Sequence, residues 1–297
     1  MRTPVFTGNC PALVTPFDKN NNMIDYDAYG RLIDAQIEAG VDAVCVCGTT
    51  GECATMSIRE HIAAMEFCVK RVDHRVTVIA GAGSNDTSAA VYLSQHAQDA
   101  GADALLHVTP YYNKASQTGL IKHYEYIAER VDLPIILYNV PSRTGVSFTA
   151  ETYKALSENH KINGVKEASG NFSLLAHTRF LCGGDFYIWS GNDDQVVPMM
   201  ALGAKGVISV ASNIIPGVMK EMTRLCLVND FEAASKLQLQ YMDLIDALFI
   251  EVNPIPIKAA MNLMGMEAGS LRLPLCDISE KNLEVLRRAM LRAGLLK

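Results

Sequence analysis

The sequence lacks long apolar runs and the cysteine spacings of metal or redox sites. No apolar segment is long enough to span a bilayer, and Met1–Phe6 contains no apolar core of a secretory signal. The eight cysteines are scattered. Cys45 and Cys47 alternate, so they are expected on one face of a buried strand and do not form a Cys-x-x-Cys motif. We therefore expect reduced thiols in a cytoplasmic protein without a membrane partner.

An excess of positive charge is also missing, as are several catalytic motifs. The formal net charge is −6 over 297 residues, which gives no electrostatic reason to expect nucleic acid as a partner. A Gly-x-Ser-x-Gly elbow, a Walker A loop and a His-Glu-x-x-His helix are absent, which disfavours esterases, nucleotide hydrolases and zinc proteases. The acidic pairs Asp25/Asp27 and Asp193/Asp194 lie at predicted helix starts, where carboxylates act as caps. We expect no metal site.

One short pattern recurs along the chain. Ala39–Val44, Ala100–Leu105 and Leu202–Val207 each contain a helix end, a glycine able to adopt the left-handed conformation, and the start of an apolar strand. Strands are predicted near Ala12–Val14, Val44–Cys47, Val76–Ala80, Ala104–Val108, Ile135–Tyr138, Ile162–Lys166, Tyr187–Trp189 and Val207–Val210. Amphipathic helices are predicted between them, such as Tyr26–Ala39, Ile58–Arg71, Ser88–Ala100 and Gly119–Arg130.

These strands are apolar throughout, which is typical of parallel strands buried on both faces. Eight βα units in series predict an α/β fold, a (β/α)8 TIM barrel over residues 1–230. An open doubly wound sheet is the main alternative, but the glycine-rich turn of dinucleotide-binding sheets does not follow the first strand. After residue 230 the predicted elements are helices only, Phe231–Glu251, Pro256–Met264 and Ser279–Leu295. Residues 231–297 are therefore expected to form a C-terminal helical region.

Lys166 is the most informative residue in such a barrel. It ends the predicted strand Ile162–Lys166, and the carboxyl ends of barrel strands face the active-site mouth. Removal from water favours the neutral form of an amine, and a neutral amine attacks carbonyl groups to form Schiff bases. Most lysines at such positions are ordinary surface residues with hydrated head groups, so Lys166 alone does not establish an active site.

The turn after the second predicted strand offers groups that bind an anion. In Gly48–Glu52, two glycines allow a tight turn, and Thr49 and Thr50 present hydroxyls and amides to a carboxylate. An ordinary strand-to-helix turn with a threonine cap is an equally good interpretation of the spacing alone.

The segment after the fifth predicted strand, Tyr138–Gly145, adds two further groups. Tyr138 is placed to pass a proton near Lys166, and Arg143 to bind a second carboxylate with its guanidinium group. A structural tyrosine followed by an exposed arginine is the alternative. Taken together, an amine, a proton carrier and two carboxylate-binding groups meet the needs of an aldol reaction on an α-keto acid.

Three segments together resemble the class I pyruvate aldolase superfamily, and within it the dihydrodipicolinate synthase family. They are Gly48–Glu52, Tyr138–Gly145 and Gly164–Ala168. The resemblance runs from about Gly8 to the C-terminus and includes Thr109–Asn113, Gly206–Val210 and Asn253–Lys258. It implies a (β/α)8 barrel with a C-terminal helical region, a homotetramer built as a dimer of dimers, and no metal or organic cofactor.

The resemblance also implies residue roles. Lys166 is expected to form an imine with pyruvate. A proton relay is expected from the hydroxyls of Tyr138, Thr50 and Tyr112, with Tyr112 reaching in from a neighbouring subunit. Pyruvate is expected to be held by Thr49, Thr50 and the segments of Gly191 and Ile208.

Arg143 distinguishes between members of the superfamily. N-acetylneuraminate lyases and keto-deoxy-sugar aldolases carry other residues there, suited to polyol substrates, so Arg143 implies L-aspartate 4-semialdehyde as the second substrate. The implied product is 4-hydroxy-tetrahydrodipicolinate, formed in the first committed step of diaminopimelate and lysine synthesis. Two alternatives stay open: another pyruvate-dependent aldolase or lyase, and a pyruvate-binding protein without turnover.

The family's lysine-binding effector pocket, at the subunit interface of lysine-sensitive members, is altered in this chain. The matching residues are Asn85, Tyr111, Ala54 and His61. Ile58, however, stands where those members have a histidine, and Ala89 where they have a glutamate that pairs with the effector's amino group. Loss of such a charge-assisted hydrogen bond costs about 1.5–3 kcal/mol. We therefore predict weak or absent inhibition by lysine.

Overall fold

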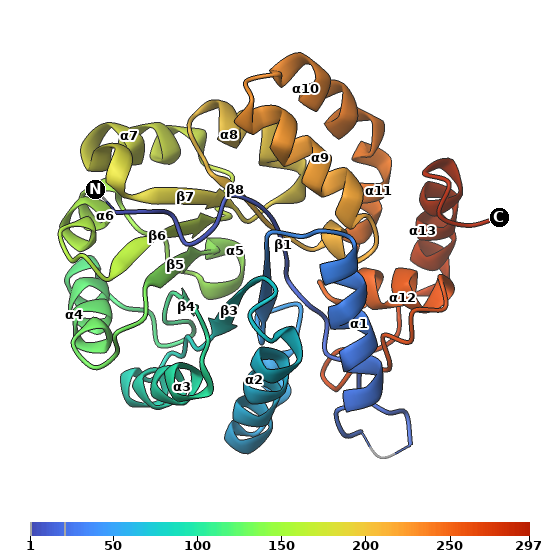
Figure 1. Ribbon diagram of the computed structural model, residues 1–297, viewed down its shortest axis with the longest axis horizontal. Helices are drawn as coiled ribbons and strands as arrows, with labels where there is room; N and C mark the ends of the chain where they lie inside the picture. The colour runs from blue at the N-terminus through green and yellow to red at the C-terminus, as the bar shows by residue number, and fades with distance from the viewer. Residues whose placement is uncertain (1, 21) are drawn as a thin grey trace.

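The computed structural model describes residues 2–20 and 22–297 and confirms the predicted (β/α)8 TIM barrel (Figure 1). Its parallel strands follow the order β1-β8-β7-β6-β5-β4-β3-β2. They are β1 (Gly8–Pro11), β2 (Ala43–Val46), β3 (Thr77–Gly81), β4 (Ala104–Val108), β5 (Ile135–Asn139), β6 (Ile162–Glu167), β7 (Tyr187–Ser190) and β8 (Gly206–Ser209). A parallel bridge between Ala12 and Cys45 joins the two ends of this order and closes the ring.

Helices surround the barrel (Figure 1). Those within the βα repeat are α1 (Tyr26–Glu38), α2 (Ile58–Val72), α3 (Thr87–Ala100), α4 (Gln117–Ala128), α5 (Pro141–Thr144), α6 (Ala150–Ser157), α7 (Phe172–Cys182), α8 (Val196–Ala201) and α9 (Pro216–Leu227). Those that follow are α10 (Phe231–Gln240), α11 (Met242–Leu248), α12 (Ile255–Leu263) and α13 (Glu280–Arg292). Short 3-10 turns are η1 (Cys53–Thr55), η2 (Gly183–Asp185), η3 (Asp193–Gln195) and η4 (Ala211–Asn213). The division of the chain at residue 230 stays a prediction.

Local sequence signals account for many helix ends. Asp25 caps α1 as predicted, because its side chain accepts a hydrogen bond from the Ala28 amide at 2.9 Å. The glycines of the recurring pattern, Gly40, Gly101 and Gly203, have φ values of 77°, 93° and 95°. Side chains other than glycine rarely adopt this left-handed conformation, so each glycine allows the chain to leave a helix and enter the next strand.

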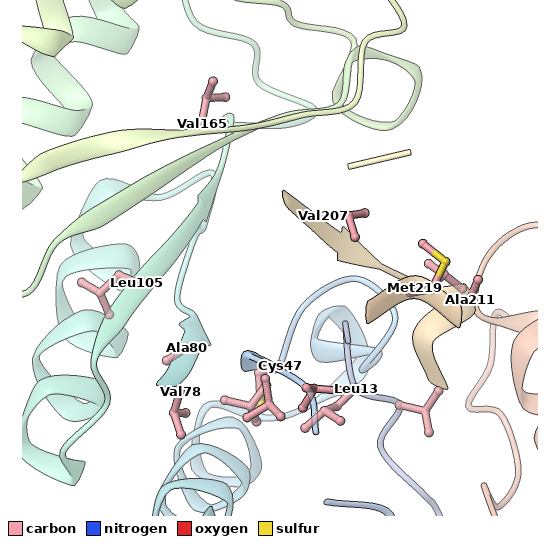
Figure 2. Close-up of a cluster of buried hydrophobic side chains, with 14 of the residues drawn as sticks. Leu13, Cys47, Val78, Ala80, Leu105, Val165, Val207, Ala211 and Met219 are labelled. Carbon is pink, nitrogen blue, oxygen red and sulfur yellow. The ribbon is translucent and has the colours of Figure 1, made fainter. Parts of the chain in front are cut away.

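The core consists of two layers. One lies inside the barrel and is built from side chains such as Cys10, Cys45, Ile136, Tyr138, Trp189 and Ile208. The other lies between the strands and the helices, and Figure 2 shows part of it, including Leu105 of β4 and Val165 of β6. Strand side chains alternate between these layers because successive residues of a strand point to opposite faces.

The amino end of the barrel is covered by the N-terminal segment. Phe6 stacks on Trp189 with ring centroids 5.3 Å apart, and the Trp189 indole donates to the Phe6 carbonyl at 3.1 Å. Arg2 donates to the Ile162 carbonyl at the start of β6. The carboxyl ends of the strands therefore form the open mouth of the barrel, where polar strand-end residues meet.

Three predictions about strand bounds, helix bounds and side-chain faces are wrong. The first strand is Gly8–Pro11 and not Ala12–Val14. The polar residue Asn9 interrupts its apolar pattern, and the Asn9 Nδ2 donates to Ser212 Oγ at 2.7 Å. The predicted helix Phe231–Glu251 is divided into α10 and α11 at Tyr241, whose φ and ψ of −102° and 5° leave the helical region.

The third error concerns the cysteine pair. Cys45 lies inside the barrel, whereas Cys47 lies in the outer layer with a φ of 55°. Strand β2 ends at Val46, so the alternation of side chains stops before Cys47 and the two thiols do not share a face. All eight cysteines are free thiols. Among residues 2–20 and 22–297, no helix has the length and apolar character needed to cross a membrane.

Candidate active site

Lys166 lies inside the carboxyl end of the barrel, next to Tyr138. The strand register places Lys166 of β6 opposite Tyr138 of β5 and opposite Trp189 of β7. Lys166 and Tyr138 are only 6% and 7% exposed, and the Lys166 Nζ lies 4.4 Å from the centroid of the Tyr138 ring. The face of an aromatic ring attracts a cation, so this contact holds the amine beside the phenol.

Gly191, at the end of β7, leaves room for the Lys166 side chain. A Cβ atom at position 191 would lie 3.1 Å from Lys166 Cε and 2.7 Å from the Ala168 Cβ. Atoms this close overlap, so any larger residue would displace the lysine. The Gly191 amide donates to the Glu167 carbonyl at 2.8 Å, which fixes the glycine backbone beside the amine.

The surroundings of Lys166 supply no competing carboxylate from its own strand. Glu167 points to the opposite face, where its carboxylate accepts hydrogen bonds from Asn139 Nδ2 at 3.1 Å and the Tyr153 hydroxyl at 2.9 Å. Ile208 is fully buried in the same interior cluster as Tyr138. The Lys166 amine therefore lies beside an apolar and phenolic cluster, and the buried carboxylate on which its charge acts, Asp193, comes from the turn after β7.

A second buried lysine, Lys258 of α12, lies elsewhere. Burial lowers its pKa to about 8, against the opposing attraction of Glu52. Its Nζ is 2.5 Å from Glu52 Oε1 and donates to the Ser270 carbonyl at 2.7 Å. Both contacts would have to break before this amine could attack a carbonyl group, so we regard Lys258 as structural.

The Asp193 carboxylate accepts hydrogen bonds other than those predicted from the sequence. Its predicted role was to cap the helix that follows it, but its Oδ2 accepts the amides of Val210 at 3.0 Å and Ala211 at 2.8 Å, just beyond β8. Burial raises its pKa, while those amides and the positive charge of Lys166 oppose the shift. Its location after the seventh strand was the signal that could have placed it at the barrel mouth.

Thr50 and Arg143 are joined through Asn253, which precedes α12. The Asn253 Nδ2 donates to Thr50 Oγ1 at 2.9 Å, and Arg143 Nη2 donates to the Asn253 carbonyl at 3.3 Å. Thr50 is buried, whereas Arg143 in α5 is exposed. Asn253 begins the segment Asn253–Lys258, which is part of the family resemblance, but the sequence alone indicates no role for this residue.

Thr49 and Arg143 line a cavity of about 460 Å3 together with residues of the predicted effector pocket. The effector-pocket residues in its wall are Ala54, Ile58, His61, Ala89 and Tyr111. Asn85 is not part of this wall; its carbonyl accepts a hydrogen bond from Asn113. Val140 belongs both to the cavity wall and to the barrel-interior cluster around Tyr138. The cavity therefore adjoins the barrel mouth.

Two of the predicted site residues, His61 of the effector pocket and Tyr112 of the proton relay, lie in contrasting surroundings. His61 is buried, its Nε2 lies 2.7 Å from the Gly81 carbonyl, and burial lowers its pKa; it therefore contributes a neutral ring. Tyr112 is 91% exposed and has a φ of 68°, so its side chain does not pack into its own barrel. In the part of the chain described, no three His, Cys, Asp or Glu side chains converge as a metal site.

The fold and this arrangement define the class: the protein is a lyase of the class I aldolase type, on a (β/α)8 barrel. A model described as the dihydrodipicolinate synthetase family matches residues 5–293. The chain belongs to this family.

Known relatives match over almost their whole length. The chain is 50% identical over 296 residues to the 4-hydroxy-tetrahydrodipicolinate synthase of Acetivibrio thermocellus, covering 100% of both chains. It resembles the crystal structure of dihydrodipicolinate synthase from Aquifex aeolicus, with a TM-score of 0.95, 45% identity, and 98% and 99% of the two chains covered. A Cyanidioschyzon merolae structure with lysine bound has a TM-score of 0.96 and 41% identity, with 99% and 100% covered.

Proposed function

We propose that this protein condenses pyruvate with L-aspartate 4-semialdehyde to give 4-hydroxy-tetrahydrodipicolinate, the first committed step of diaminopimelate and lysine synthesis. The observation that carries the proposal is the buried Lys166 amine, 4.4 Å from the centre of the Tyr138 ring at the barrel mouth. A Schiff-base aldolase requires a lysine amine and, next to it, a group that transfers protons. Family membership supports the choice of substrates.

The first stage activates pyruvate. The Lys166 amine attacks C2 of pyruvate, and loss of water gives an imine between Nζ and C2. The protonated imine withdraws electrons, so C3 loses a proton and becomes the nucleophilic carbon of an enamine. Tyr138, Thr50 and Tyr112 are proposed to carry this proton. Pyruvate is proposed to be held by Thr49, Thr50 and the segments of Gly191 and Ile208.

The second stage forms the carbon–carbon bond and closes the ring. The enamine C3 attacks the aldehyde carbon of the semialdehyde, and the resulting alkoxide takes a proton from the hydroxyl relay. The amino group of the semialdehyde portion then attacks C2 and displaces the Lys166 amine, giving a cyclic imine. One water is released overall, and no oxidant or reductant is consumed.

Arg143 is proposed to bind the carboxylate of the semialdehyde. It lies in the wall of the cavity that adjoins the barrel mouth, and its guanidinium group can form two parallel hydrogen bonds to a carboxylate. Its link to Thr50 through Asn253 supports the view that the two substrates are held by neighbouring groups.

We further propose a cytoplasmic homotetramer, built as a dimer of dimers, that works without metal or organic cofactor. The exposed Tyr112 supports a role of this residue in the site of a neighbouring subunit. Weak or absent inhibition by lysine is proposed because Ala89 provides no carboxylate for the effector's amino group and Ile58 replaces a histidine of the sensitive members; both residues lie in the cavity wall.

The decisive experiment compares substrates with one enzyme preparation. Condensation of pyruvate with aspartate 4-semialdehyde is measured beside cleavage of N-acetylneuraminate, with and without a metal chelator. We expect condensation, no appreciable cleavage, and no effect of the chelator. Arg143→Ala should raise the semialdehyde KM by roughly 10- to 100-fold, whereas the surface control Arg288→Ala should not. Cleavage without condensation would assign the protein to another aldolase, and an unchanged KM would remove Arg143 from its role.

A further inference from the structure

Strands β5 and β6 do not pair in one continuous register. Ile135 pairs with Ile162, but the next residue of β5, Ile136, pairs with Gly164. Asn163 is thus an extra residue in β6, and irregularities of this kind occur next to active sites, where they re-aim the side chains beyond them. The direction of every later side chain of β6 depends on the register above this shift.

The N-terminal segment holds the extra residue in place. The Asn163 Nδ2 donates to the Thr3 carbonyl at 2.9 Å, and the Val5 amide donates to the Asn163 Oδ1 at 3.2 Å. Both polar ends of this side chain are therefore occupied, so the shift is a fixed feature of the strand. It lies near the beginning of β6, whereas Lys166 lies near its carboxyl end.

Apolar side chains specify the register above the shift only weakly. Gly164 has no side chain, Val165 packs in the outer layer of the core, and the strand then ends with Lys166 and Glu167. A slip of one residue would turn Lys166 toward the helices and Glu167 into the barrel, because successive side chains of a strand point to opposite faces. A further contact is therefore needed to hold the amine inside.

Asn139 and Glu167 supply such a contact on the outer face. The register pairs these two residues directly beyond the pair of Tyr138 and Lys166. The Asn139 Nδ2 lies 3.1 Å from each oxygen of the Glu167 carboxylate. A carboxylate only accepts hydrogen bonds. Turning the amide over would place its oxygen against both carboxylate oxygens, so the direction of this cross-strand hydrogen bond is fixed.

Two further donors hold the Glu167 carboxylate. The Tyr153 hydroxyl of α6 donates to Oε2 at 2.9 Å, and the Ser169 amide donates to Oε1 at 2.8 Å. The side chains of Asn139, Tyr153 and Glu167 are all buried, and hydrogen bonds in such surroundings are stronger than in water. The carboxylate thus ties the end of β6 to β5, to α6 and to the turn that follows β6.

We propose that Glu167 is a positioning residue that locks the register of β5 and β6 above the shift. Held by Asn139 and Tyr153 on the outer face, it keeps the Lys166 amine inside the barrel without touching the substrate. The inference rests on the proposed function, because it concerns the placement of the nucleophile proposed there.

Removal of the acceptor tests this lock. Glu167→Met keeps the length of the side chain but leaves the Asn139 amide and the Tyr153 hydroxyl without their acceptor. The rate constant for formation of the borohydride-trapped pyruvate adduct is measured per folded protein. We expect it to fall about tenfold or more, since a displacement of about 1 Å at a reacting group can cost about 100-fold. Glu167→Gln retains an accepting oxygen and should keep most of the rate.

The loss should concern the amine and not the affinity for the second substrate. Glu167→Met should lower kcat and leave the semialdehyde KM near its wild-type value, because Arg143 belongs to α5 and not to β6. Tyr153→Phe removes one donor to Glu167 and should also slow adduct formation. Tyr124→Phe is the matched control: it removes the hydroxyl of another buried tyrosine, whose partner is the His107 carbonyl at 3.5 Å, and should keep the wild-type adduct rate.

A double-mutant cycle isolates the route through the carboxylate. If Tyr153 acts through Glu167, Tyr153→Phe should cause no further loss of adduct rate in the Glu167→Met background. Full additivity in this cycle, a wild-type rate in folded Glu167→Met, or an equal loss in Glu167→Gln overturns the inference. If Glu167→Met does not fold, Asn139→Leu, which removes only the cross-strand donor, is judged by the same rate. Failure of the wild-type protein to form any adduct would instead refute the proposed function itself.

Discussion

The Lys166 Nζ lies 4.4 Å from the centroid of the Tyr138 ring, and the strand register makes the two residues direct neighbours across β5 and β6. Neighbouring parallel strands hold their side chains at a fixed separation, so the amine and the phenol stay paired without help from a mobile loop. We propose separable roles for the two parts of Tyr138: the ring places the amine, and the hydroxyl moves protons.

Tyr138→Phe separates these roles. The ring is retained, so Lys166 should stay in place and the borohydride-trapped pyruvate adduct should still form. Loss of the hydroxyl should lower kcat by roughly 10²- to 10⁴-fold, the usual contribution of a general acid or base. Tyr126→Phe, which alters a tyrosine that is 45% exposed, is the control and should leave kcat unchanged. A kcat within a factor of ten of wild type in Tyr138→Phe would contradict the proton-carrying role.

Gly191→Ala tests the packing around the amine. The added Cβ would lie 2.7 Å from the Ala168 Cβ and 3.1 Å from Lys166 Cε, so the lysine must move. We expect a loss of about 1–3 kcal/mol in the free energy of unfolding, with slower adduct formation. At Gly217 in α9, an added Cβ meets no atom within 4 Å, so Gly217→Ala should leave adduct formation unchanged. Equal rates in the two variants would show that Gly191 does not shape the site.

Regulation is tested by restoring charge to the cavity. The unaltered protein should show weak or no inhibition by lysine, because Ile58 and Ala89 in the cavity wall are uncharged. Ile58→His combined with Ala89→Glu should increase lysine affinity by roughly 10- to 100-fold. This factor corresponds to the contribution of about 1.5–3 kcal/mol that one charge-assisted hydrogen bond makes to the binding free energy. Inhibition of the unaltered protein at micromolar lysine would refute this account.

Two buried histidines predict a loss of stability in mild acid. Burial lowers the pKa of His107 to about 3, with the nearby His123 adding to the shift, and lowers that of His123 to about 4. As the pH falls below 6.5, the unfolded chain binds protons at these positions while the folded chain does not. Their contribution to the free energy of unfolding is therefore complete above pH 6.5. It is lost progressively toward pH 4, at up to about 1.4 kcal/mol per pH unit for each histidine.

Urea unfolding at pH 7 and pH 5, at constant protein concentration, measures this loss. His123→Asn should reduce the difference between the two pH values, because one titrating group is removed. His160→Asn changes an exposed histidine and should leave the difference unaltered. The histidine assignment fails if His123→Asn and wild type lose the same free energy between pH 7 and pH 5.

The sequence predicted the parts of the site that depend on strand ends. Topology brings the carboxyl ends of barrel strands together, so a local apolar pattern ending at Tyr138 or at Lys166 is enough to place both residues at the mouth. The register of β5 and β6 then pairs them. The fold was predictable for the same reason, because its repeating unit is short and three of the repeats end at a glycine with positive φ, Gly40, Gly101 and Gly203.

Contacts made by the C-terminal region could not be predicted in this way. Asn253 reaches Thr50 across 203 residues, and its position depends on how α12 packs against the barrel, which the spacing of apolar residues does not determine. Asp193 was misassigned because a carboxylate before a helix usually caps that helix; here burial turns it toward the amides beyond β8. The role of Tyr112 depends on a second subunit and stays a prediction.

The most direct test of the account is the location of the covalent adduct. The protein is incubated with pyruvate, reduced with borohydride and digested, and the modified peptide is identified by mass spectrometry. We predict a single modification, on Lys166, that is lost in Lys166→Ala and retained in Lys161→Ala, whose lysine donates instead to the Val131 carbonyl. Absence of an adduct, or an adduct on Lys258 in place of Lys166, would contradict the central claim.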